Sequence, residues 1–441
     1  MTSPQGWIDV AFEEITPPDA PIIYGILQPG PDIPGGVPYV RPTEIVGGNI
    51  DTANIRRTST AIAKRYDRAS LRSGDTVLSI VGTIGKVAEA PDELDGGNIT
   101  QSSCRLRHDD SLLSGAYLRA FLRSPGAKAQ FDDKRLGTAV PRLNIADIRQ
   151  FALPLPPLAE QRRILAKLDA LTARLFRARA ELDRVPVLAA NLRKQTLRDA
   201  FGPGTQTVPI GELISDIRYG TAKKCDYGGG AVQVLRIPNV QAGRIDLGDL
   251  KSADFDAKEL AKLSLLEGDI LVIRSNGSLD LVGRSAIVDD SAAGMLFAGY
   301  LIRMRVDPTK CIPEYLHHFL QSPVARDNIT MAAKSTSGVN NVNAQQLQAL
   351  HVPLPDLATQ RSLIQQIEQS FARADRLEAE ATRARALLDR LETALLAKAF
   401  RGELVPQDPN DEPAQTLLDR IRQQRAAAPK AQRGRKGKVA A

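Results

Sequence analysis

Cysteine and aromatic residues are scarce in this chain of 441 residues. Its three cysteines, Cys104, Cys225 and Cys311, are scattered and form no CxxC pair, which argues against a zinc site and a disulfide framework. A reducing cytoplasm fits such a set of cysteines best. Aromatic residues make up only 5% of the chain, too few for extensive stacking of nucleic-acid bases on aromatic platforms.

Long apolar runs and nucleotide-binding motifs are also missing. No apolar run approaches the length that crosses a bilayer, and residues 1–15 lack the basic and apolar parts of a secretory signal, so we expect a cytoplasmic protein with no membrane partner. No GxGxxG follows a strand pattern. The run GTIGK at Gly82–Lys86 is not a Walker loop, because only two residues separate its glycines and Val87 replaces the required Ser or Thr. We predict a turn between strands there.

The four histidines show no spacing typical of metal ligands. His317 and His318 fall in the run YLHHFLQS, an amphipathic helix pattern, and we expect at least one of the pair simply to pack. The sequence therefore predicts no catalytic residues, no metal site and no cofactor in this chain.

Positive charge is only slightly in excess outside the C-terminal tail. The formal charge is +7 and the isoelectric point is near 9.3, which hints at a polyanionic partner. Five of the cations lie in the basic end of the tail, residues 430–438, which contains no acidic residue, and removing them leaves the rest at +2, so charge alone does not identify a DNA binder. The tail is either a disordered arm that adds nonspecific DNA affinity or a solubilising end. The five tail cations are Lys430, Arg433, Arg435, Lys436 and Lys438.

The chain contains an internal repeat. PLPPLAEQRRIL begins at Pro154 and PLPDLATQRSLI begins at Pro353, an offset that continues without a gap to Ala200-Phe201 and Ala399-Phe400. The preceding halves also match, with small changes of offset that indicate loop insertions. Matched pairs there are Tyr24-Gly25 with Tyr219-Gly220, Arg41 with Arg236, Gly74-Asp75 with Gly268-Asp269, Tyr117 with Tyr315 and Asn144 with Asn343.

The repeat predicts an α+β chain with pseudo-two-fold internal duplication. Two similar mixed α/β domains alternate with two long antiparallel coiled-coil helices, and one clear helix in each domain is YLRAFLRS or YLHHFLQS. The predicted divisions are a first domain at 1–153, a helix at 154–202, a second domain at 203–352, a second helix at 353–403, and a tail at 404–441 that includes a short amphipathic helix.

The helical segments carry apolar residues at alternating spacings of four and three, as in an a/d seam. Asp356 is the expected N-cap of the second helix, and Pro186 predicts a kink or break deep inside the first. Each segment would span roughly 65–70 Å at 1.5 Å per residue. A dimerisation coiled coil is the simpler alternative, but two spacers of equal length favour a ruler that fixes the distance between the domains.

With this layout, several runs carry a resemblance to a known family. They are the two PLP openings, the closing AKAFRGEL, the GVNNVN segment and RSNGSLDLVGR. The chain resembles the specificity subunit of a Type I restriction–modification enzyme over nearly its whole length, including the tail run TLLDRIRQQRAA. The order, the spacing and the duplication of these runs all agree with the resemblance.

The resemblance implies a division of labour. Each domain would be a target recognition domain that reads one half of a split double-stranded DNA sequence, and the helices would set the gap and dock two modification (methyltransferase) subunits. Those subunits would use S-adenosylmethionine to methylate adenine at N6, and restriction (motor–nuclease) subunits would add ATP- and Mg-dependent cleavage. The tail helix would contact a modification subunit. This chain itself would be non-catalytic, and it has no NPPY- or DPPF-like tetrapeptide.

Residues that read DNA are expected on Gly-rich loops, where the backbone approaches closely and Arg, Lys, Asn, Ser or Thr reach a groove edge. For any single Lys or Arg the alternative is a solvated surface charge. In the second domain the candidates are Thr221, Lys223, Lys224, Arg274, Ser275, Asn276, Ser278, Lys334, Thr336 and Asn340. In the first domain they are Lys86, Lys134, Arg135, Thr138 and Arg142. Arg41 and Arg236, matched between the domains, favour the shared fold or a shared backbone contact instead.

A second interpretation is a coiled-coil scaffold whose domains bind proteins. DNA binding that is absent, or insensitive to salt, would favour it. An enzyme is disfavoured because no catalytic constellation is present. The amino-acid sequence does not show which bases the DNA target would contain.

Overall fold

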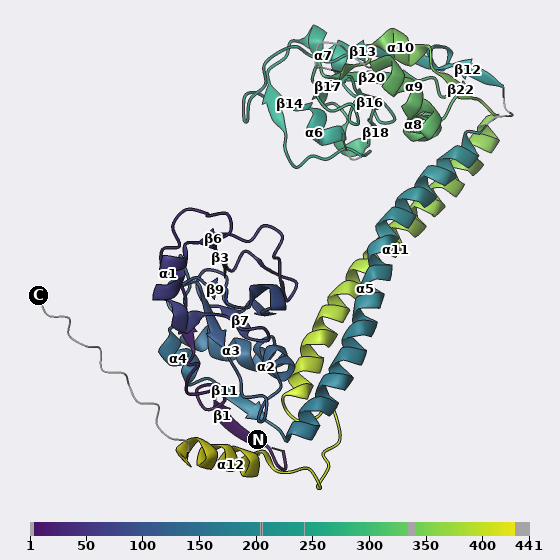
Figure 1. Cartoon of the computed structure of the whole chain (residues 1–441). Helices are drawn as coiled ribbons and strands as arrows, with labels where there is room; N and C mark the ends of the chain where they lie inside the picture. Colours follow the sequence, from purple (N-terminus) through teal and green to yellow (C-terminus); the bar gives the residue numbers. More distant parts are fainter. Residues whose placement is uncertain (1–3, 203, 205, 242, 334–339, 428–441) are drawn as a thin grey trace, which may run out of the picture. The chain divides into compact units, whose positions relative to one another are not determined.

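The structure is a computed structural model that describes residues 4–202, 204, 206–241, 243–333 and 340–427. The chain forms two compact units. Unit 1 is residues 1–180 with 384–441, and unit 2 is residues 181–383. Each unit contains one globular domain and portions of the two long helices α5 (Leu158–Ala200) and α11 (Leu357–Ala399) (Figure 1).

The globular part of unit 1 is built from short strands and short helices. Its centre is a four-stranded antiparallel sheet in the order β2-β10-β7-β8, accompanied by a β6-β3-β9 sheet and the pairs β1-β11 and β4-β5. The strands are β1 Ile8–Ala11, β2 Ile23–Tyr24, β3 Val37–Val40, β4 Ile45–Val46, β5 Asn49–Ile50, β6 Arg57–Thr58, β7 Thr76–Ser79, β8 Val87–Glu89, β9 Asn98–Ile99, β10 Ser103–Leu106 and β11 Ala152–Leu155. The helices are α1 Thr60–Arg65, α2 Gly115–Leu122, α3 Pro125–Lys134, α4 Ile145–Arg149 and α12 Ala414–Ala427.

The globular part of unit 2 repeats this sheet arrangement. A four-stranded antiparallel sheet in the order β13-β20-β16-β18 is accompanied by a β15-β14-β19 sheet and the pairs β12-β22 and β17-β21. The strands are β12 Thr207–Pro209, β13 Ile214–Tyr219, β14 Val232–Leu235, β15 Lys251–Ala253, β16 Ile270–Ile273, β17 Ser275–Asn276, β18 Ser285–Ile287, β19 Leu296–Phe297, β20 Leu301–Val306, β21 Asn340–Asn341 and β22 His351–Pro353. The helices are α6 Ile237–Val240, α7 Ala257–Leu263, α8 Pro313–Gln321, α9 Pro323–Ala333 and α10 Ala344–Gln348.

The two units use the same hydrogen bonds to join the globular part to a long helix. In unit 1 the Tyr117 hydroxyl donates to the carbonyl oxygen of Pro154 at 3.0 Å, and in unit 2 Tyr315 donates to Pro353 at 2.7 Å. Buried Gln161 of α5 donates to the carbonyl oxygens of Leu112 and Pro156. Buried Gln360 of α11 donates in the same way to those of Lys310 and Pro355. These matched bonds explain why the PLP-x-LAxQR runs recur in the sequence.

Several local predictions are confirmed. The runs YLRAFLRS and YLHHFLQS form α2 and α8, and residues 80–86 connect two antiparallel strands, as expected for GTIGK. The Asp356 carboxylate accepts from the backbone N–H of Thr359 at 2.7 Å, which is the N-cap bond expected at the start of α11.

Of the kink or break expected at Pro186 in helix α5, the break is absent. The helix runs unbroken from Leu158 to Ala200 with Pro186 inside it, so the break that a proline can cause does not occur. Pro186 itself is exposed. Its ring therefore displaces no core side chain, and neighbouring turns continue the helix on both sides.

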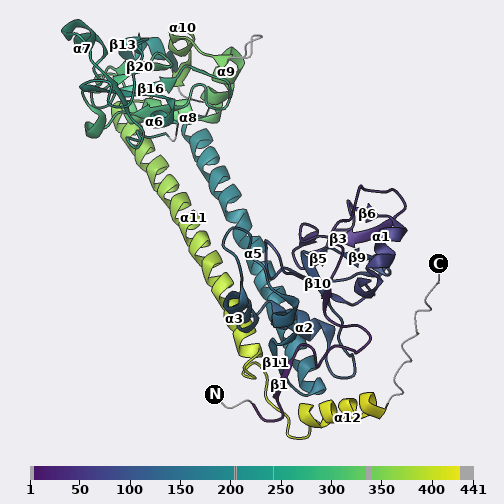
Figure 2. The same ribbon diagram turned by 90° about the vertical axis from the view of Figure 1, so that its left-hand side faces the viewer.

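Ion pairs join α5 to α11 within each unit. In unit 1 Arg179 contacts Asp389 and Glu392, each at 2.7 Å. In unit 2 Arg193 contacts Glu378 at 2.7 Å, and the Thr196 hydroxyl lies 2.7 Å from that of Ser370, so residue numbers rise along α5 as they fall along α11 (Figure 2).

Most of the expected apolar seam between the long helices is buried or half-buried. Ile164, Ala189 and Ile367 lie in the interior. Leu377 and Leu391, which the four-three spacing assigns to the seam of the second helix, differ from the prediction, because they are 41% and 48% exposed. A strict heptad therefore overestimates the width of the contact between the helices.

The tail helix α12 packs on the globular part of unit 1. Its buried side chains Leu417, Leu418 and Ile421 belong to the same apolar core as Trp7. The backbone N–H of Ala414 donates to the carbonyl oxygen of Gly6 at 3.0 Å. The resemblance implied that this helix contacts a modification subunit, but its apolar face is covered by its own chain (Figure 1).

Candidate nucleic-acid interface

Two separate candidate loops of unit 2 lie against each other. The short strands β17 and β21 pair antiparallel, with Ser275 opposite Asn341 and Asn276 opposite Asn340. The side-chain amide of Asn340 also donates to the carbonyl oxygen of Gly277 at 3.1 Å. The RSNGS run and the NN run, far apart in the sequence, therefore form one continuous surface.

Arg274 is held at this surface by stacking. Its guanidinium lies over the ring of Tyr219, 4.6 Å from the centroid, and its Nε donates to Asn341 Oδ1 at 3.3 Å. The Tyr219 hydroxyl accepts from the backbone N–H of Ala344 at 3.0 Å. Within the described part of the chain the terminal nitrogens of Arg274 have no partner. They are the groups with which an arginine reads the edge of a guanine or holds a phosphate.

The GTAKK run presents its three polar residues differently. Thr221 is buried, and its hydroxyl accepts from the backbone N–H of Lys223 at 3.0 Å. The Lys223 ammonium donates to the carbonyl oxygen of Asp254 at 2.5 Å and lies 4.9 Å from the centroid of Phe255. The side chain of Lys224 is 88% exposed, with a single ion pair at 3.6 Å to Asp226. Lys224 is thus the cation of this run that is best placed to meet an external phosphate.

The segment Gly299-Tyr300 joins the GTAKK and RSNGS runs. The backbone N–H of Gly299 donates to the carbonyl oxygen of Thr221, and the backbone N–H of Arg274 donates to that of Tyr300, both at 2.8 Å. Tyr300 is 63% exposed beside them. Sequence reasoning missed this tyrosine, and the only available signal was its position directly before the β20 run LIRMRV.

Two candidates cannot be placed in this way. Lys334 and Thr336 lie outside the described residues. Ser278 is described, and its backbone N–H donates to the Asn276 side chain at 2.8 Å, which closes the turn after β17.

The corresponding loops of unit 1 also meet. Val81 forms a bridge with Arg142, as Ser275 does with Asn341 in unit 2, and Arg142 bridges Leu136 as well. The backbone N–H of Gly82 donates to the carbonyl oxygen of Pro141 at 2.8 Å. The GTIGK turn and the 135–142 loop therefore share one surface.

The five candidates of unit 1 are not equally available on that surface. The Lys86 ammonium donates to the carbonyl oxygen of Pro42 at 2.9 Å and is half-buried. Lys134 forms an exposed ion pair with Asp133 at 3.0 Å. Arg135 and Thr138 are exposed, and Arg135 lines a cavity of about 550 Å³ between the GTIGK turn and α3. The ammonium of Lys86 is therefore already hydrogen-bonded within the domain, whereas the guanidinium of Arg135 is available to a ligand.

Comparisons with known proteins extend along most of the chain. Residues 32–182 match the family model of the Type I restriction modification DNA specificity domain. The chain is 28% identical over 421 residues to the EcoKI specificity subunit of Escherichia coli K12, covering 89% of both chains. It is 27% identical over 419 residues to the StySPI specificity subunit of Salmonella potsdam, again covering 89% of both. The chain is therefore similar, over most of its length, to Type I restriction specificity subunits, and residues 32–182 match their DNA specificity domain.

Two solved structures have a similar fold. A crystal structure of the HsdS subunit from Thermoanaerobacter tengcongensis matches with a TM-score of 0.61 at 23% identity, covering 91% of this chain and 98% of that one. A chain from a study of complex assembly and conformational transition of the type I R-M system matches with a TM-score of 0.67 at 22% identity, covering 91% of this chain and all of that one. Specificity subunits are non-catalytic components of these systems.

The arginines that are matched between the two units stabilise the fold of their own domains. Arg41 pairs with Glu44 at 2.5 Å, and Arg236 pairs with Asp249 at 2.8 Å. The hydrogen bond to Glu44 is the main reason that the pKa of Arg41 is raised. Both side chains therefore act inside their own domains, which agrees with the role expected for matched residues.

A second matched set lies in the two four-stranded sheets. Arg107 pairs with buried Asp75 at 2.5 Å, and Arg305 pairs with buried Asp269 at 2.7 Å. Their neighbour Arg105 is buried, which lowers its pKa to about 10, and it donates to the carbonyl oxygen of Ser70 at 2.8 Å. These pairs explain the repeated Gly-Asp at 74–75 and 268–269.

Two further features bear on chemistry. No helix in the described ranges is long and apolar enough to cross a bilayer. Among the described residues no three His, Cys, Asp or Glu side chains are grouped so that they could hold a metal ion.

Proposed function

We propose that this specificity subunit reads a bipartite double-stranded DNA sequence, one half with the globular domain of each unit. The observation that carries the proposal is the matched pairing of candidate loops, Ser275 with Asn341 and Val81 with Arg142. The same backbone framework presents different side chains in the two units. Two readers that arose by internal duplication would in this way recognise different bases.

We also propose that α5 and α11 form an antiparallel coiled coil that acts as a spacer between the half-sites and as the dock for two modification subunits. Support comes from their equal length of 43 residues and from exposed apolar side chains such as Phe176 and Leu387. A solvent-exposed phenylalanine on a helix is favoured where a partner covers it. The relatives named above belong to the same class of enzyme.

The chemistry of the assembled enzyme would lie in the partners. Modification subunits would transfer a methyl group from S-adenosylmethionine to adenine N6, and restriction subunits would cleave DNA with ATP and Mg. The complex would work in the cytoplasm. This chain would determine which DNA sequence is recognised and would hold no cofactor.

The experiment that tests the DNA role is a salt titration of binding by the assembled subunit and modification subunits. Binding to DNA that contains the target should weaken steeply as salt rises, because cationic side chains displace counterions from phosphates. Arg274→Ala should reduce discrimination at one base pair of one half-site by about 1–3 kcal/mol and leave assembly intact. Lys258→Ala, which removes an exposed cation in α7, is the matched control. Binding that ignores salt would point to a protein-binding scaffold instead.

A further inference from the structure

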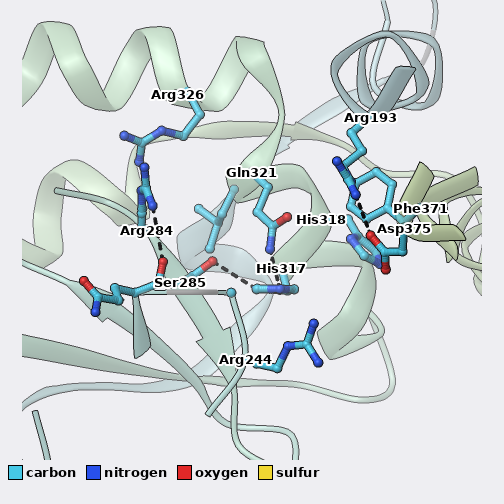
Figure 3. Close-up of a pocket in the computed structure, with 13 residues that line it drawn as sticks. Arg193, Arg244, Arg284, Ser285, His317, His318, Gln321, Arg326, Phe371 and Asp375 are labelled. Carbon is cyan, nitrogen blue, oxygen red and sulfur yellow. Dashed lines mark hydrogen bonds and ion pairs between the residues drawn. The ribbon is translucent and has the colours of Figure 1, made fainter. Parts of the chain in front are cut away.

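A cavity of about 580 Å³ lies inside unit 2, where the globular domain meets the long helices (Figure 3). Arg284 and Ser285 at β18, His317 and His318 of α8, and Arg326 of α9 form its globular side. Arg193 of α5 and Phe371 and Asp375 of α11 form its helical side. Its chemistry is not needed for the reading of bases proposed above.

The cavity is strongly cationic. Four arginines line it, and the single carboxylate in the lining, that of Asp375, is already paired with Arg193 at 2.5 Å. Arg244 points its guanidinium into the open space below His317 (Figure 3), and no residue of the described chain hydrogen-bonds to it or forms an ion pair with it. An anion would therefore find an uncompensated charge here.

Arg284 and Arg326 lie against each other, and the nearby charge of Asp280 only partly offsets their mutual repulsion. Arg284 Nε and Arg326 Nη2 both donate to the carbonyl oxygen of Asp280, at 2.9 and 3.1 Å. Arg326 Nη1 donates to that of Val282 at 2.7 Å. Burial, with the neighbouring charge of Arg284, lowers the pKa of Arg326. A guanidinium has five N–H donors, so each of the two keeps several for a ligand.

A buried polar atom without a partner also lines the cavity. His318 is only 8% exposed, and its Nδ1 makes no hydrogen bond. Its neighbour His317 is fully engaged, with Nδ1 3.0 Å from the Ser285 hydroxyl and Nε2 2.6 Å from the Gln321 amide. Leaving a buried ring nitrogen without a hydrogen bond is unfavourable, and a hydrogen-bonding ligand would remove that cost.

We propose that this cavity binds a phosphate group. Arginine guanidinium groups match the oxygens of a phosphate with two parallel hydrogen bonds, and a neutral imidazole can donate to or accept from the same group. The volume exceeds that of one phosphate, so the rest of a nucleotide, a second phosphate or a stretch of DNA backbone fits beside it. Arg284 ends the loop that starts at Arg274, so the bound phosphate would brace the base of that loop.

The test measures inorganic phosphate and pyrophosphate binding to the full-length chain by titration calorimetry at constant ionic strength. Wild type should bind at least one of the two saturably, with a Kd below about 10 mM. Arg244→Gln should weaken this binding roughly tenfold or more, because a charge-assisted hydrogen bond is lost. Arg244 is exposed, so the fold should persist, which an unchanged thermal midpoint would verify. Lys258→Gln removes the same charge in α7 and should leave binding unchanged.

A second arm separates the two sources of phosphate. If a DNA backbone phosphate is the ligand, Arg244→Gln weakens binding to a nonspecific duplex and lowers the slope of log affinity against log salt by about one. This holds even where inorganic phosphate and pyrophosphate bind weakly. If a free phosphate compound is the ligand, calorimetry responds and the duplex affinity does not. Either result supports the site. No saturable anion binding together with unchanged duplex binding in Arg244→Gln overturns it, without affecting the proposed reading of a bipartite target.

Discussion

Side chains in the candidate interface divide into two groups. Some expose a charged group to solvent, and others bond to neighbouring residues and so stabilise a loop. Lys224 is mostly exposed, whereas the ammonium of Lys223, its neighbour in sequence, donates to Asp254 and stacks on Phe255. Two adjacent lysines therefore differ in role for reasons that only the folded chain reveals.

This difference predicts separate effects for two alanine substitutions. Lys224→Ala should weaken binding to all DNA sequences and lower the slope of log affinity against log salt by about one unit, because one phosphate contact is lost. Lys223→Ala should lower the thermal midpoint instead and change the salt slope less. Fluorescence anisotropy over a salt series, with thermal unfolding of both variants, measures both effects. Equal slopes for wild type and Lys224→Ala would remove Lys224 from the interface.

The histidine pair of α8 makes unit 2 sensitive to acid. Burial lowers the pKa of His317 to about 3, helped by the charge of His318, and lowers that of His318 to about 4, from 6.5 in the unfolded chain. The charged groups that face the pair are Arg244, Arg284 and the Arg193–Asp375 ion pair. Below pH 6.5 the unfolded chain binds protons that the folded chain does not, so stability is complete above pH 6.5 and falls as the pH drops toward 4.

His318→Phe should flatten this dependence. Between pH 6.5 and 5 the free energy of unfolding of wild type should fall by up to about 1.4 kcal/mol per pH unit more than that of the variant, because one titrating group is removed. Phenylalanine keeps the ring contact that His318 makes with Phe371, 5.8 Å between centroids. Denaturant unfolding at three pH values measures the difference. Parallel curves for the two proteins would show that His318 does not titrate as described.

At the scale of whole elements, α12 is a structural part of unit 1. Leu418 is buried in the core that contains Trp7, the only tryptophan in the chain. Arg425 also reaches Asp109 at 3.0 Å. The helix therefore stabilises the domain on which it lies.

Leu418→Ala should cost about 2–5 kcal/mol, since a buried leucine leaves a cavity in a packed core. The tryptophan fluorescence of Trp7 reports this domain specifically, so its unfolding midpoint should drop. Thr416→Ala changes an exposed position of the same helix and serves as the control. A midpoint unchanged by Leu418→Ala would mean that α12 does not pack here.

Pro186 is the residue of α5 whose replacement is most expected to stabilise the helix. The helix continues through it, and the side chain is exposed, so the proline removes a backbone hydrogen bond without an evident packing role. Pro186→Ala should raise the free energy of unfolding by up to about 3 kcal/mol. Helical circular dichroism during thermal unfolding measures the gain. A lower midpoint would indicate that the proline has a packing role in the helix pair.

For the whole molecule, the sequence predicts helices and strands better than it predicts the surfaces on which they pack or bind. The two long helices and the cap at Asp356 follow from local pattern, because caps and periodicity are local physics. The predicted starts at residues 154 and 353 lie four residues before the observed starts at Leu158 and Leu357, because the preceding residues pair as strands β11 and β22. The exposure of Leu377 and Leu391 does not follow, because the angle and width of a helix contact depend on both partners.

The candidate site was predictable only in part. The loops that bear Arg274 and Asn340 were found from their glycines and polar residues, but their pairing through β17 and β21 is a tertiary contact. The same is true of the Lys86 bond to Pro42 and of the place of Tyr300 between two loops. The cationic cavity could not be predicted from the sequence, since its four arginines come from four separate segments of unit 2.

The central claim is that this chain alone determines the bipartite DNA sequence that the complex recognises. The most direct measurement is to express it with its modification subunits in a methylation-free host and to map N6-methyladenine by single-molecule sequencing. The account predicts one new motif made of two short parts with a fixed gap, absent when this chain is omitted and relaxed in one part only by Arg274→Ala. Methylation at an undivided motif, or no new motif from a stable complex that binds S-adenosylmethionine, would contradict it.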